Sequence, residues 1–132
     1  MTGRVHLDTH VVVWLAAGES DRLPQTSRDL IVDAEVFISP MVRLELQLLH
    51  EKKRISAGPD AVLEPLVSAL GLRQDPTPFS EVVSSAIQPD RTWPHRDPFD
   101  RLIAAGAFAA GALLVTKDAL LRKQFSTLTR WE

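Results

Sequence analysis

The sequence predicts an α/β fold with three layers, α/β/α, in which helices cover both faces of a central parallel sheet of about five strands. Short apolar runs alternate with longer amphipathic segments along the chain. Two of these segments open with a helix-start signal, Ser39-Pro40 and Asp97-Pro98, in which a capping side chain precedes proline at the first helical position. Residues 112–115 are apolar throughout, which is typical of a strand buried on both faces of a parallel sheet.

The expected elements follow one another as strand, helix, strand, with right-handed crossovers between parallel strands. We expect strands at residues 4–7, 36–38, 72–74, 112–115 and 128–131. We expect helices at residues 11–17, 23–33, 40–54, 60–70, 80–87, 98–110 and 119–125. The run Asp8-Thr9-His10 is expected to form a turn after the first strand.

The composition suits one globular domain spanning residues 1–132. A chain of this length can bury roughly two thirds of its unfolded surface in one core. Cysteine is absent, which excludes a disulfide framework and a thiolate nucleophile and agrees with the reducing cytoplasm. The first strand begins too early to leave room for a signal peptide, and the longest apolar stretch, residues 102–115, is too short for a membrane span. We therefore expect a cytoplasmic protein without a membrane partner.

Four acidic residues are predicted to gather at one edge of the sheet. Asp8 follows the first strand and Asp118 follows the fourth. Because the carboxyl ends of parallel strands meet at one edge, these two side chains share it. Glu45 lies in the second turn of the helix after the second strand, and Asp100 lies in the first turn of the helix before the fourth strand. Both can face the same edge.

A cluster of this kind predicts a site for a divalent ion. Carboxylates held within a few ångströms repel one another, and their pKa values rise unless a cation neutralises them. Ligands that are all oxygen suit Mg²⁺ or Mn²⁺. Such an ion binds a phosphate oxygen, activates a water molecule and stabilises the leaving oxygen. The candidate ligands are Asp8, Glu45, Asp100 and Asp118.

Each acid also has a purely structural interpretation. Asp8 and Asp118 can cap the helices that follow them, and Asp100 can be half of a capping box. Glu45 lies among leucines, either on the polar stripe of its helix or buried for a purpose. Only the coincidence of four acids at one edge favours a functional site. Residues that neighbour the site could support it: Thr9 and Thr116, which can donate to a carboxylate or phosphate, and Asp97, which we interpret as a helix cap.

Other catalytic motifs are excluded. The run that starts at His50-Glu51 begins like a zinc-protease motif but has Arg54 where the second histidine is needed. There is no nucleophile elbow and no glycine loop that could cradle a phosphate. The histidines show no ligand spacing and are expected to be at the surface or partly buried: His6, His10, His50 and His95. The tryptophans are expected in the core or at an interface and not as platforms for base stacking: Trp14, Trp93 and Trp131.

Four blocks of the sequence, in this order, resemble those of PIN-domain ribonucleases of the VapC toxin type. The blocks are Leu7-Asp8-Thr9-His10-Val11-Val12-Val13-Trp14-Leu15, the stretch from Ile38-Ser39-Pro40 to Leu44-Glu45, Asp97-Pro98-Phe99-Asp100-Arg101-Leu102-Ile103-Ala104-Ala105, and Val115-Thr116-Lys117-Asp118. Together they extend from the first strand to the fourth, and no position of the acidic quartet departs from the pattern.

The resemblance implies a PIN domain in which Asp8, Glu45, Asp100 and Asp118 hold Mg²⁺ or Mn²⁺. It implies cleavage of RNA phosphodiester bonds by metal-activated water, as the toxin of a type II toxin–antitoxin system. It also implies a homodimer and a cognate VapB-type antitoxin as partners.

The net charge of the chain does not indicate where RNA would bind. A formal net charge of −2 provides no general attraction to nucleic acid, so binding requires a local basic patch. The basic candidates are scattered along the sequence: Arg43, Lys52, Lys53, Arg54, Arg96, Arg101 and Lys117.

Two other classes of function remain open from the residues alone. A phosphoacceptor signalling domain also places acids, a threonine and a lysine at strand ends, as Asp8, Thr116 and Lys117 do, but it does not need Glu45. A non-catalytic module that binds a partner through an apolar surface would use the acids only as helix caps.

Overall fold

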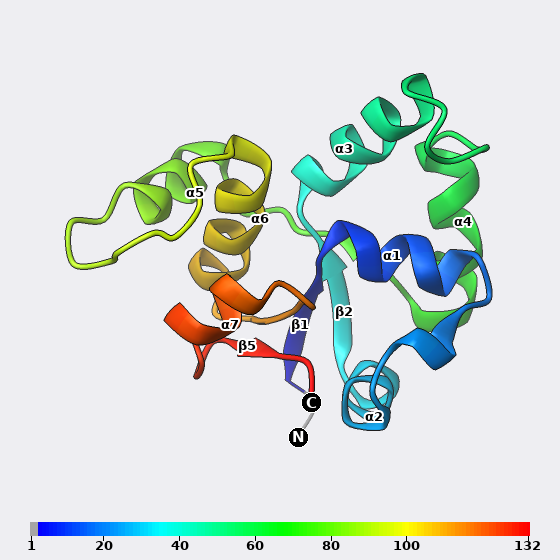
Figure 1. Cartoon of the computed structure of the whole chain (residues 1–132), viewed down its shortest axis with the longest axis horizontal. Coiled ribbons are helices and arrows are strands. Elements are labelled where there is room, and N and C mark those ends of the chain that lie inside the picture. The colour runs from blue at the N-terminus through cyan, green and yellow to red at the C-terminus, as the bar shows by residue number, and fades with distance from the viewer. Residues whose placement is uncertain (1–2) are drawn as a thin grey trace.

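The computed structural model describes residues 3–132 and has a parallel five-stranded sheet with helices on both faces (Figure 1). The strands are β1 (Arg4–Leu7), β2 (Glu35–Ile38), β3 (Arg73–Gln74), β4 (Leu113–Val115) and β5 (Thr129–Arg130). They lie in the order β3-β2-β1-β4-β5, and each neighbouring pair is parallel. The predicted three-layer α/β/α class with about five strands is therefore confirmed.

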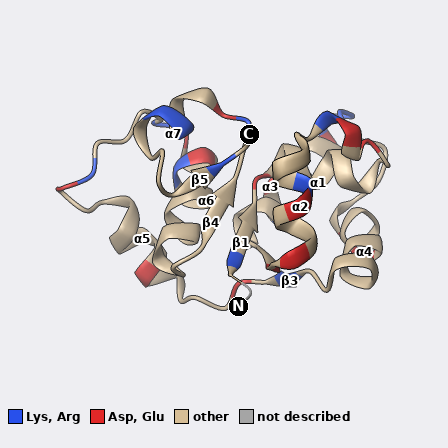
Figure 2. Cartoon of the chain, turned by 90° about the horizontal axis from the view of Figure 1, so that it is seen from below, with Lys and Arg blue, Asp and Glu red and all other residues tan. Residues whose placement is uncertain are grey.

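Helices connect the strands and cover the sheet. They are α1 (Thr9–Ala16), the short 3-10 helix η1 (Ser20–Arg22), α2 (Gln25–Asp33), α3 (Pro40–Glu51), α4 (Pro59–Leu70), α5 (Phe79–Ala86), α6 (Pro98–Ala109) and α7 (Ala119–Gln124). In Figure 1, α1 and α4 lie on one side of β1 and β2, whereas α5 and α6 lie on the other. Figure 2 shows that basic and acidic residues are interspersed along these elements, in line with the small net charge.

Helix boundaries follow local signals in the sequence. The Ser39 hydroxyl accepts a hydrogen bond from an N–H in the first turn of α3, and the Asp97 carboxylate accepts two in the first turn of α6. Both residues precede a proline at the start of the helix. The chain leaves α4 at Gly71 and passes Gly111 after α6, with φ values of 67° and 68° that glycine adopts without steric cost.

The prediction for the first helix is wrong at its start. Thr9 and His10 form the first turn of α1 rather than a separate turn. Asp8 has extended backbone geometry, and its carboxylate accepts a hydrogen bond of 2.8 Å from the Thr9 N–H. The helix can therefore begin directly after Asp8, and this brings His10 to the carboxyl edge of the sheet.

The core lies on both faces of the central strands. Its members in the middle of the sheet are at most 2% exposed: Val5, Leu7, Val36, Ile38, Leu114 and Val115. Helix α6 presents small residues to this sheet, among them the fully buried Ala104 and Ala107. Small side chains allow close approach of a helix, so α6 carries Asp100 near the strand ends.

A buried polar pair joins β1 to the segment after β3. His6 is 1% exposed, and its Nε2 lies 2.9 Å from Oδ2 of Asp75. The other carboxylate oxygen of Asp75, Oδ1, accepts from the Thr77 N–H. Burial lowers the pKa of His6. Burial acts to raise the pKa of Asp75, but the hydrogen bonds from Thr77 and His6 outweigh it and lower the pKa overall. His6 is therefore a neutral donor to an ionised carboxylate.

We expect Asp75→Ala to destabilise the protein by about 1–3 kcal/mol, because it leaves His6 buried with neither ring nitrogen paired. Urea unfolding at neutral pH measures the difference. Asp33→Ala is the control, since Asp33 is exposed at the end of α2. Equal stability of the two variants would contradict a stabilising role for the pair.

Within residues 3–132, every helix is too short or too polar to span a lipid bilayer.

Candidate active site

The candidate site lies where the connectivity of the sheet changes direction. β1 pairs with β2 on one side and with β4 on the other. The chain thus leaves β1 toward β2 and β3 and returns later to its opposite side. Ligands of open parallel sheets bind outside the carboxyl ends of the strands at such a switch point. Asp8 directly follows β1, and Asp118 lies three residues after β4.

A cleft of about 670 Å³ opens at this edge. Its lining includes all four predicted acids, with Glu45 contributed by the second turn of α3 and Asp100 by the first turn of α6. The other lining residues are Thr9, His10, Val13, Trp14, Leu49, Arg54, Ile55 and Lys117. The structure therefore brings to one cleft four carboxylates that are far apart in the sequence, and it leaves Asp97 and Thr116 outside the lining.

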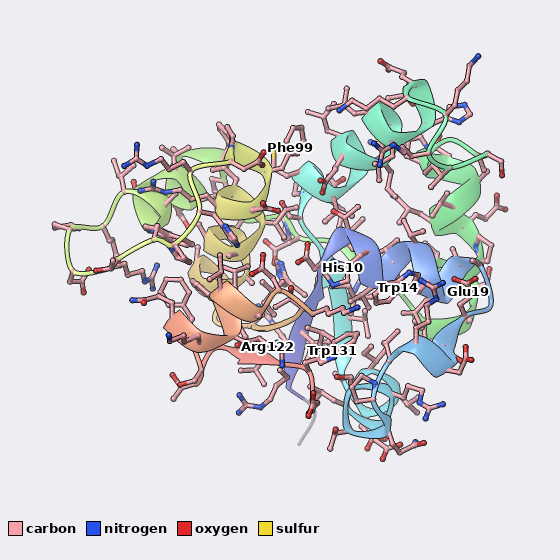
Figure 3. All side chains as sticks on the ribbon, viewed as in Figure 1. His10, Trp14, Glu19, Phe99, Arg122 and Trp131 are labelled. Atoms are coloured by element: carbon pink, nitrogen blue, oxygen red, sulfur yellow. The ribbon has the colours of Figure 1, made fainter. Side chains whose placement is uncertain are left out.

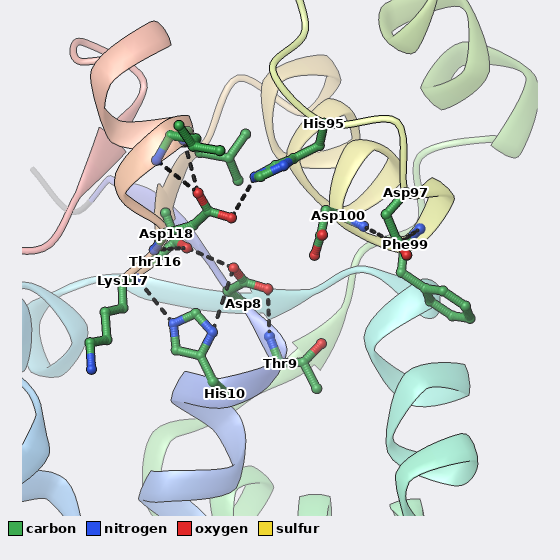
Figure 4. A network of polar contacts seen from close by, with 12 residues as sticks. Asp8, Thr9, His10, His95, Asp97, Phe99, Asp100, Thr116, Lys117 and Asp118 are labelled. Carbon is green, nitrogen blue, oxygen red and sulfur yellow. Dashed lines mark hydrogen bonds and ion pairs between the residues drawn. The ribbon is translucent and has the colours of Figure 1, made fainter.

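Asp8 is held by the first residue of α1 and by the residue that follows β4 (Figure 4). One carboxylate oxygen accepts from the Thr9 N–H, and the other accepts from the Thr116 hydroxyl at 2.7 Å. The Thr116 oxygen in turn accepts from the backbone N–H of Asp118 at 3.0 Å. Thr116 is fully buried, and its hydroxyl links the Asp8 carboxylate after β1 to the backbone N–H of Asp118 after β4.

Asp118 has both of its carboxylate oxygens engaged. Oδ1 accepts from the N–H groups of Leu120 and Leu121 at the start of α7, so the predicted helix cap is present. Oδ2 lies 2.6 Å from Nε2 of His95, which reaches it from the loop before α6 (Figure 4). Asp118 is thus a cap that also lines the cleft, and one role does not exclude the other.

The pKa values of Glu45 and Asp100 are both raised in the folded chain. Burial raises the pKa of Glu45, and the charges of Asp8, Asp100 and Asp97 raise it further, against a hydrogen bond from the Thr9 hydroxyl that lowers it. Burial likewise raises the pKa of Asp100, with Asp97, Asp8 and Asp118 adding to the effect and His95 opposing it. Both carboxyl groups are easier to protonate than in water because the folded chain disfavours their charge.

The capping-box interpretation of Asp100 is wrong. The carboxylate of Asp97 accepts from the Asp100 N–H at 3.2 Å, but no hydrogen bond to the Asp100 carboxylate occurs in the part of the chain that the structure describes. Asp97 is the cap of α6, as predicted, and Asp100 is left with an unpaired carboxylate in the cleft.

Two histidines contact the predicted acids, a role that the sequence did not indicate. His10 Nε2 accepts a 2.9 Å hydrogen bond from the Lys117 N–H, so the neutral ring carries its proton on Nδ1, which lies 3.8 Å from Asp8 Oδ2. Burial lowers the pKa of His10. His95 bonds to Asp118 across 23 residues of sequence. Both rings are partly buried, as expected. Their contacts with residues far away in the sequence could not be predicted, because residue spacing does not report which segments meet in the fold.

The donor set fits a hard divalent cation, although the ligands are not gathered in advance. Within residues 3–132, no three His, Asp or Glu side chains are placed so that they could hold one metal ion. Asp8, Glu45 and Asp118 instead make hydrogen bonds to Thr116, Thr9 and His95. The expectation that the carboxylates lie within a few ångströms as a ready ligand set is therefore not met. The oxygen chemistry of the four carboxylates and their shared cleft, together with the raised pKa values of Glu45 and Asp100, still suit Mg²⁺ or Mn²⁺.

Comparison with known proteins decides the family. The family model of the PIN domain matches residues 5–124. The chain belongs to the PIN-domain family. This PIN domain is 35% identical over 124 residues to Ribonuclease VapC22 of Mycobacterium tuberculosis, a match that covers 89% of each chain. The predicted resemblance to VapC-type PIN ribonucleases is confirmed, and neither a phosphoacceptor domain nor a non-catalytic module is favoured.

Solved structures share the fold of this PIN domain. It superimposes on VapBC2 from Rickettsia felis bound to a promoter DNA fragment with a TM-score of 0.65 and 21% identity, covering 98% of this chain and 99% of that chain. It superimposes on DNA-bound VapBC from Salmonella typhimurium with a TM-score of 0.59 and 22% identity, covering 97% and 93%. At these identities the comparison concerns the fold alone.

Proposed function

We propose that this PIN domain is a metal-dependent endoribonuclease and the toxin of a type II toxin–antitoxin pair. One observation carries the proposal: carboxylates from four separate segments line a single cleft at the switch point of the sheet. The 35% identity to a protein named as a ribonuclease supports RNA as the substrate. The catalytic residues that we propose are Asp8, Glu45, Asp100 and Asp118.

The same four carboxylates would hold Mg²⁺, or Mn²⁺ in its place. When bound, such an ion neutralises the charge of the carboxylates and of the scissile phosphate and lowers the pKa of a water molecule for attack on phosphorus. Asp100 is best suited to the ion because its carboxylate has no competing hydrogen bond in the described chain.

Other residues of the chain keep these carboxylates in place. The Thr116 hydroxyl donates to Asp8 and accepts from the Asp118 N–H, so it couples two of the four segments. The Thr9 hydroxyl donates to Glu45 and so couples α1, which directly follows Asp8, to α3. Asp97 caps α6 and so fixes the turn that carries Asp100. These are the supporting roles that we assign to Thr9, Thr116 and Asp97.

A VapB-type antitoxin is the protein partner that we propose, together with a second copy of this chain in a homodimer. Two structures that share the fold are VapBC assemblies by name, which supports the antitoxin. The location that we propose is the cytoplasm, where RNA is available and where a chain without cysteine needs no oxidising compartment.

An RNA cleavage assay tests the proposal. Protein purified free of antitoxin is incubated with structured and unstructured RNAs in Mg²⁺, in EDTA, and in EDTA followed by excess Mg²⁺ or Mn²⁺. We expect cleavage only with the divalent ion and recovery when the ion is restored. Asp100→Asn protein, prepared in the same way, reveals any contaminating nuclease. Cleavage that persists in EDTA would contradict metal dependence, and a lack of cleavage in Mg²⁺ would contradict the nuclease assignment.

A further inference from the structure

A tryptophan lies in the same cleft as the four carboxylates. Trp14 is in the second turn of α1 and is only partly buried, whereas Trp131 is 7% exposed and belongs to the core. The expectation that the tryptophans are core or interface residues holds for Trp131, and the partly buried Trp14 and Trp93 pack against the core. Trp14 also lines the cleft. An aromatic ring with an accessible part beside a phosphate-binding site can serve as a contact for a nucleobase.

Neighbouring rings fix the position of Trp14 (Figure 3). The His10 ring lies 5.2 Å from it, and the Trp131 ring lies 6.1 Å from it, measured between centroids. His10 is itself held by the Lys117 N–H and faces Asp8. A single histidine ring therefore separates the indole from the carboxylate at the end of β1, and the indole is rigidly placed relative to the acidic site.

Two cations lie over this indole. The Lys117 ammonium is 5.5 Å from the ring centroid, and the Arg22 guanidinium is 5.3 Å from it. Both residues are exposed. The Arg22 guanidinium also pairs with Glu19 at 3.3 Å, a surface ion pair that can be exchanged for a phosphate at little cost. Lys117 also lines the cleft and directly precedes Asp118. In the overall mildly acidic chain, this cluster combines an aromatic ring with positive charge next to the candidate active site.

We propose that Trp14 is the platform on which a base of single-stranded RNA stacks beside the phosphate to be cleaved, with Lys117 and Arg22 binding the flanking phosphates. The inference rests on the proposed function and adds the position and the chemistry of a substrate subsite. Stacking on an aromatic ring tolerates every base because each has a π face, whereas it requires a base that is unpaired. The subsite thus favours single-stranded RNA over a duplex, without selecting a sequence.

The test separates the base from its phosphate. A short single-stranded RNA is titrated against Asp100→Asn protein, which binds without cutting, and each nucleoside is replaced in turn by an abasic ribose. We expect one position at which loss of the base weakens binding roughly 5- to 150-fold, the range of a single base–aromatic stack. Adding Trp14→Leu to the Asp100→Asn protein should weaken binding of the intact RNA by a similar factor. It should not change binding of the RNA that is abasic at that position. Trp14→Phe, which keeps a ring, should retain most of the affinity.

Several outcomes would overturn the inference. The first is that Trp14→Leu weakens the binding of intact RNA and of abasic RNA equally, and the second is that it weakens the binding of neither. The third is that Trp14→Phe binds intact RNA as weakly as Trp14→Leu does. Thermal melting of each variant shows whether the fold is kept. The scan with abasic RNAs uses protein with Trp14 intact, so it tests the inference even if a Trp14 variant does not fold. If the wild-type protein cleaves RNA but shows no such base dependence, the subsite is wrong and the nuclease stands. If base dependence appears without any cleavage, the nuclease is wrong and the binding site stands.

Discussion

Asp100→Asn is expected to reduce the rate of RNA cleavage by about 100-fold or more at saturating Mg²⁺. The substitution keeps the size of the side chain and removes a negative charge and a metal-binding oxygen. Since the Asp100 carboxylate makes no hydrogen bond in the described chain, the fold loses no polar contact. The loss should therefore appear in catalysis and not in stability, and single-turnover cleavage with thermal melting of the same samples measures both.

Asp90→Asn is the matched control for this variant. Asp90 is an exposed residue of the loop before α6 and does not line the cleft, so we expect cleavage at the wild-type rate. Asp8→Asn should behave like Asp100→Asn in cleavage but should also lower stability, because its carboxylate accepts hydrogen bonds from Thr9 and Thr116. Wild-type cleavage by Asp100→Asn would contradict the role of this carboxylate.

Divalent ions are expected to stabilise the folded protein, by about 2.7 kcal/mol when the ion is present at 100 times its Kd. We expect the ion to bind the carboxylates that the folded chain brings to one cleft, a site that the unfolded chain lacks. Mg²⁺ at millimolar concentration should therefore raise the Tm of the wild-type protein, and Glu45→Gln should remove most of that increase. Differential scanning calorimetry in EDTA and in increasing Mg²⁺ measures the effect.

Glu45→Gln, which should remove the stabilisation by Mg²⁺, should itself stabilise the metal-free protein. The folded chain raises the pKa of Glu45, chiefly through burial and then through neighbouring negative charges. A carboxyl group with a raised pKa in the folded state contributes stability below its unfolded pKa, and this contribution is lost as pH rises through the folded pKa. At neutral pH in EDTA, Glu45→Gln should therefore be more stable than the wild type. The difference should shrink as pH falls through the raised pKa of Glu45 toward the ordinary value of a glutamate, and it should be absent below that value.

Glu51→Gln serves as the control in both experiments, because Glu51 is an exposed residue at the end of α3 and lies outside the cleft. It should keep the Mg²⁺ response and show no gain of stability in EDTA. A Glu45→Gln protein that still gains the full Tm increase in Mg²⁺ would show that this carboxylate does not contribute to ion binding.

The sequence was sufficient to predict the sheet and the edge at which the acids meet. Parallel strands deliver whatever follows them to one edge, so Asp8 and Asp118 could be placed together from their positions after two apolar runs. Glu45 and Asp100 could be placed there because each lies within two turns of a helix start that is marked by proline. These conclusions depend on the order of strands and helices along the chain, which hydrophobic patterns and helix-start signals indicate.

Contacts between segments could not be predicted. His95 bonds to Asp118, and His6 to Asp75 across 69 residues, because the fold brings loops together in ways that no local pattern records. The start of α1 was misplaced because a run of Asp, Thr and His is compatible with a turn as well as with a capped first turn. That error concealed the position of His10, and with it the proximity of Trp14 to the acidic site.

The central claim is that Asp8, Glu45, Asp100 and Asp118 bind one kind of divalent ion together, and titration with Mn²⁺ followed by electron paramagnetic resonance tests it most directly. The signal of free Mn²⁺ gives the bound fraction without any substrate. We expect each of four variants to weaken Mn²⁺ binding and Asp90→Asn to leave it unchanged; the four are Asp8→Asn, Glu45→Gln, Asp100→Asn and Asp118→Asn. Binding of Mn²⁺ to all four variants with the wild-type affinity would contradict it.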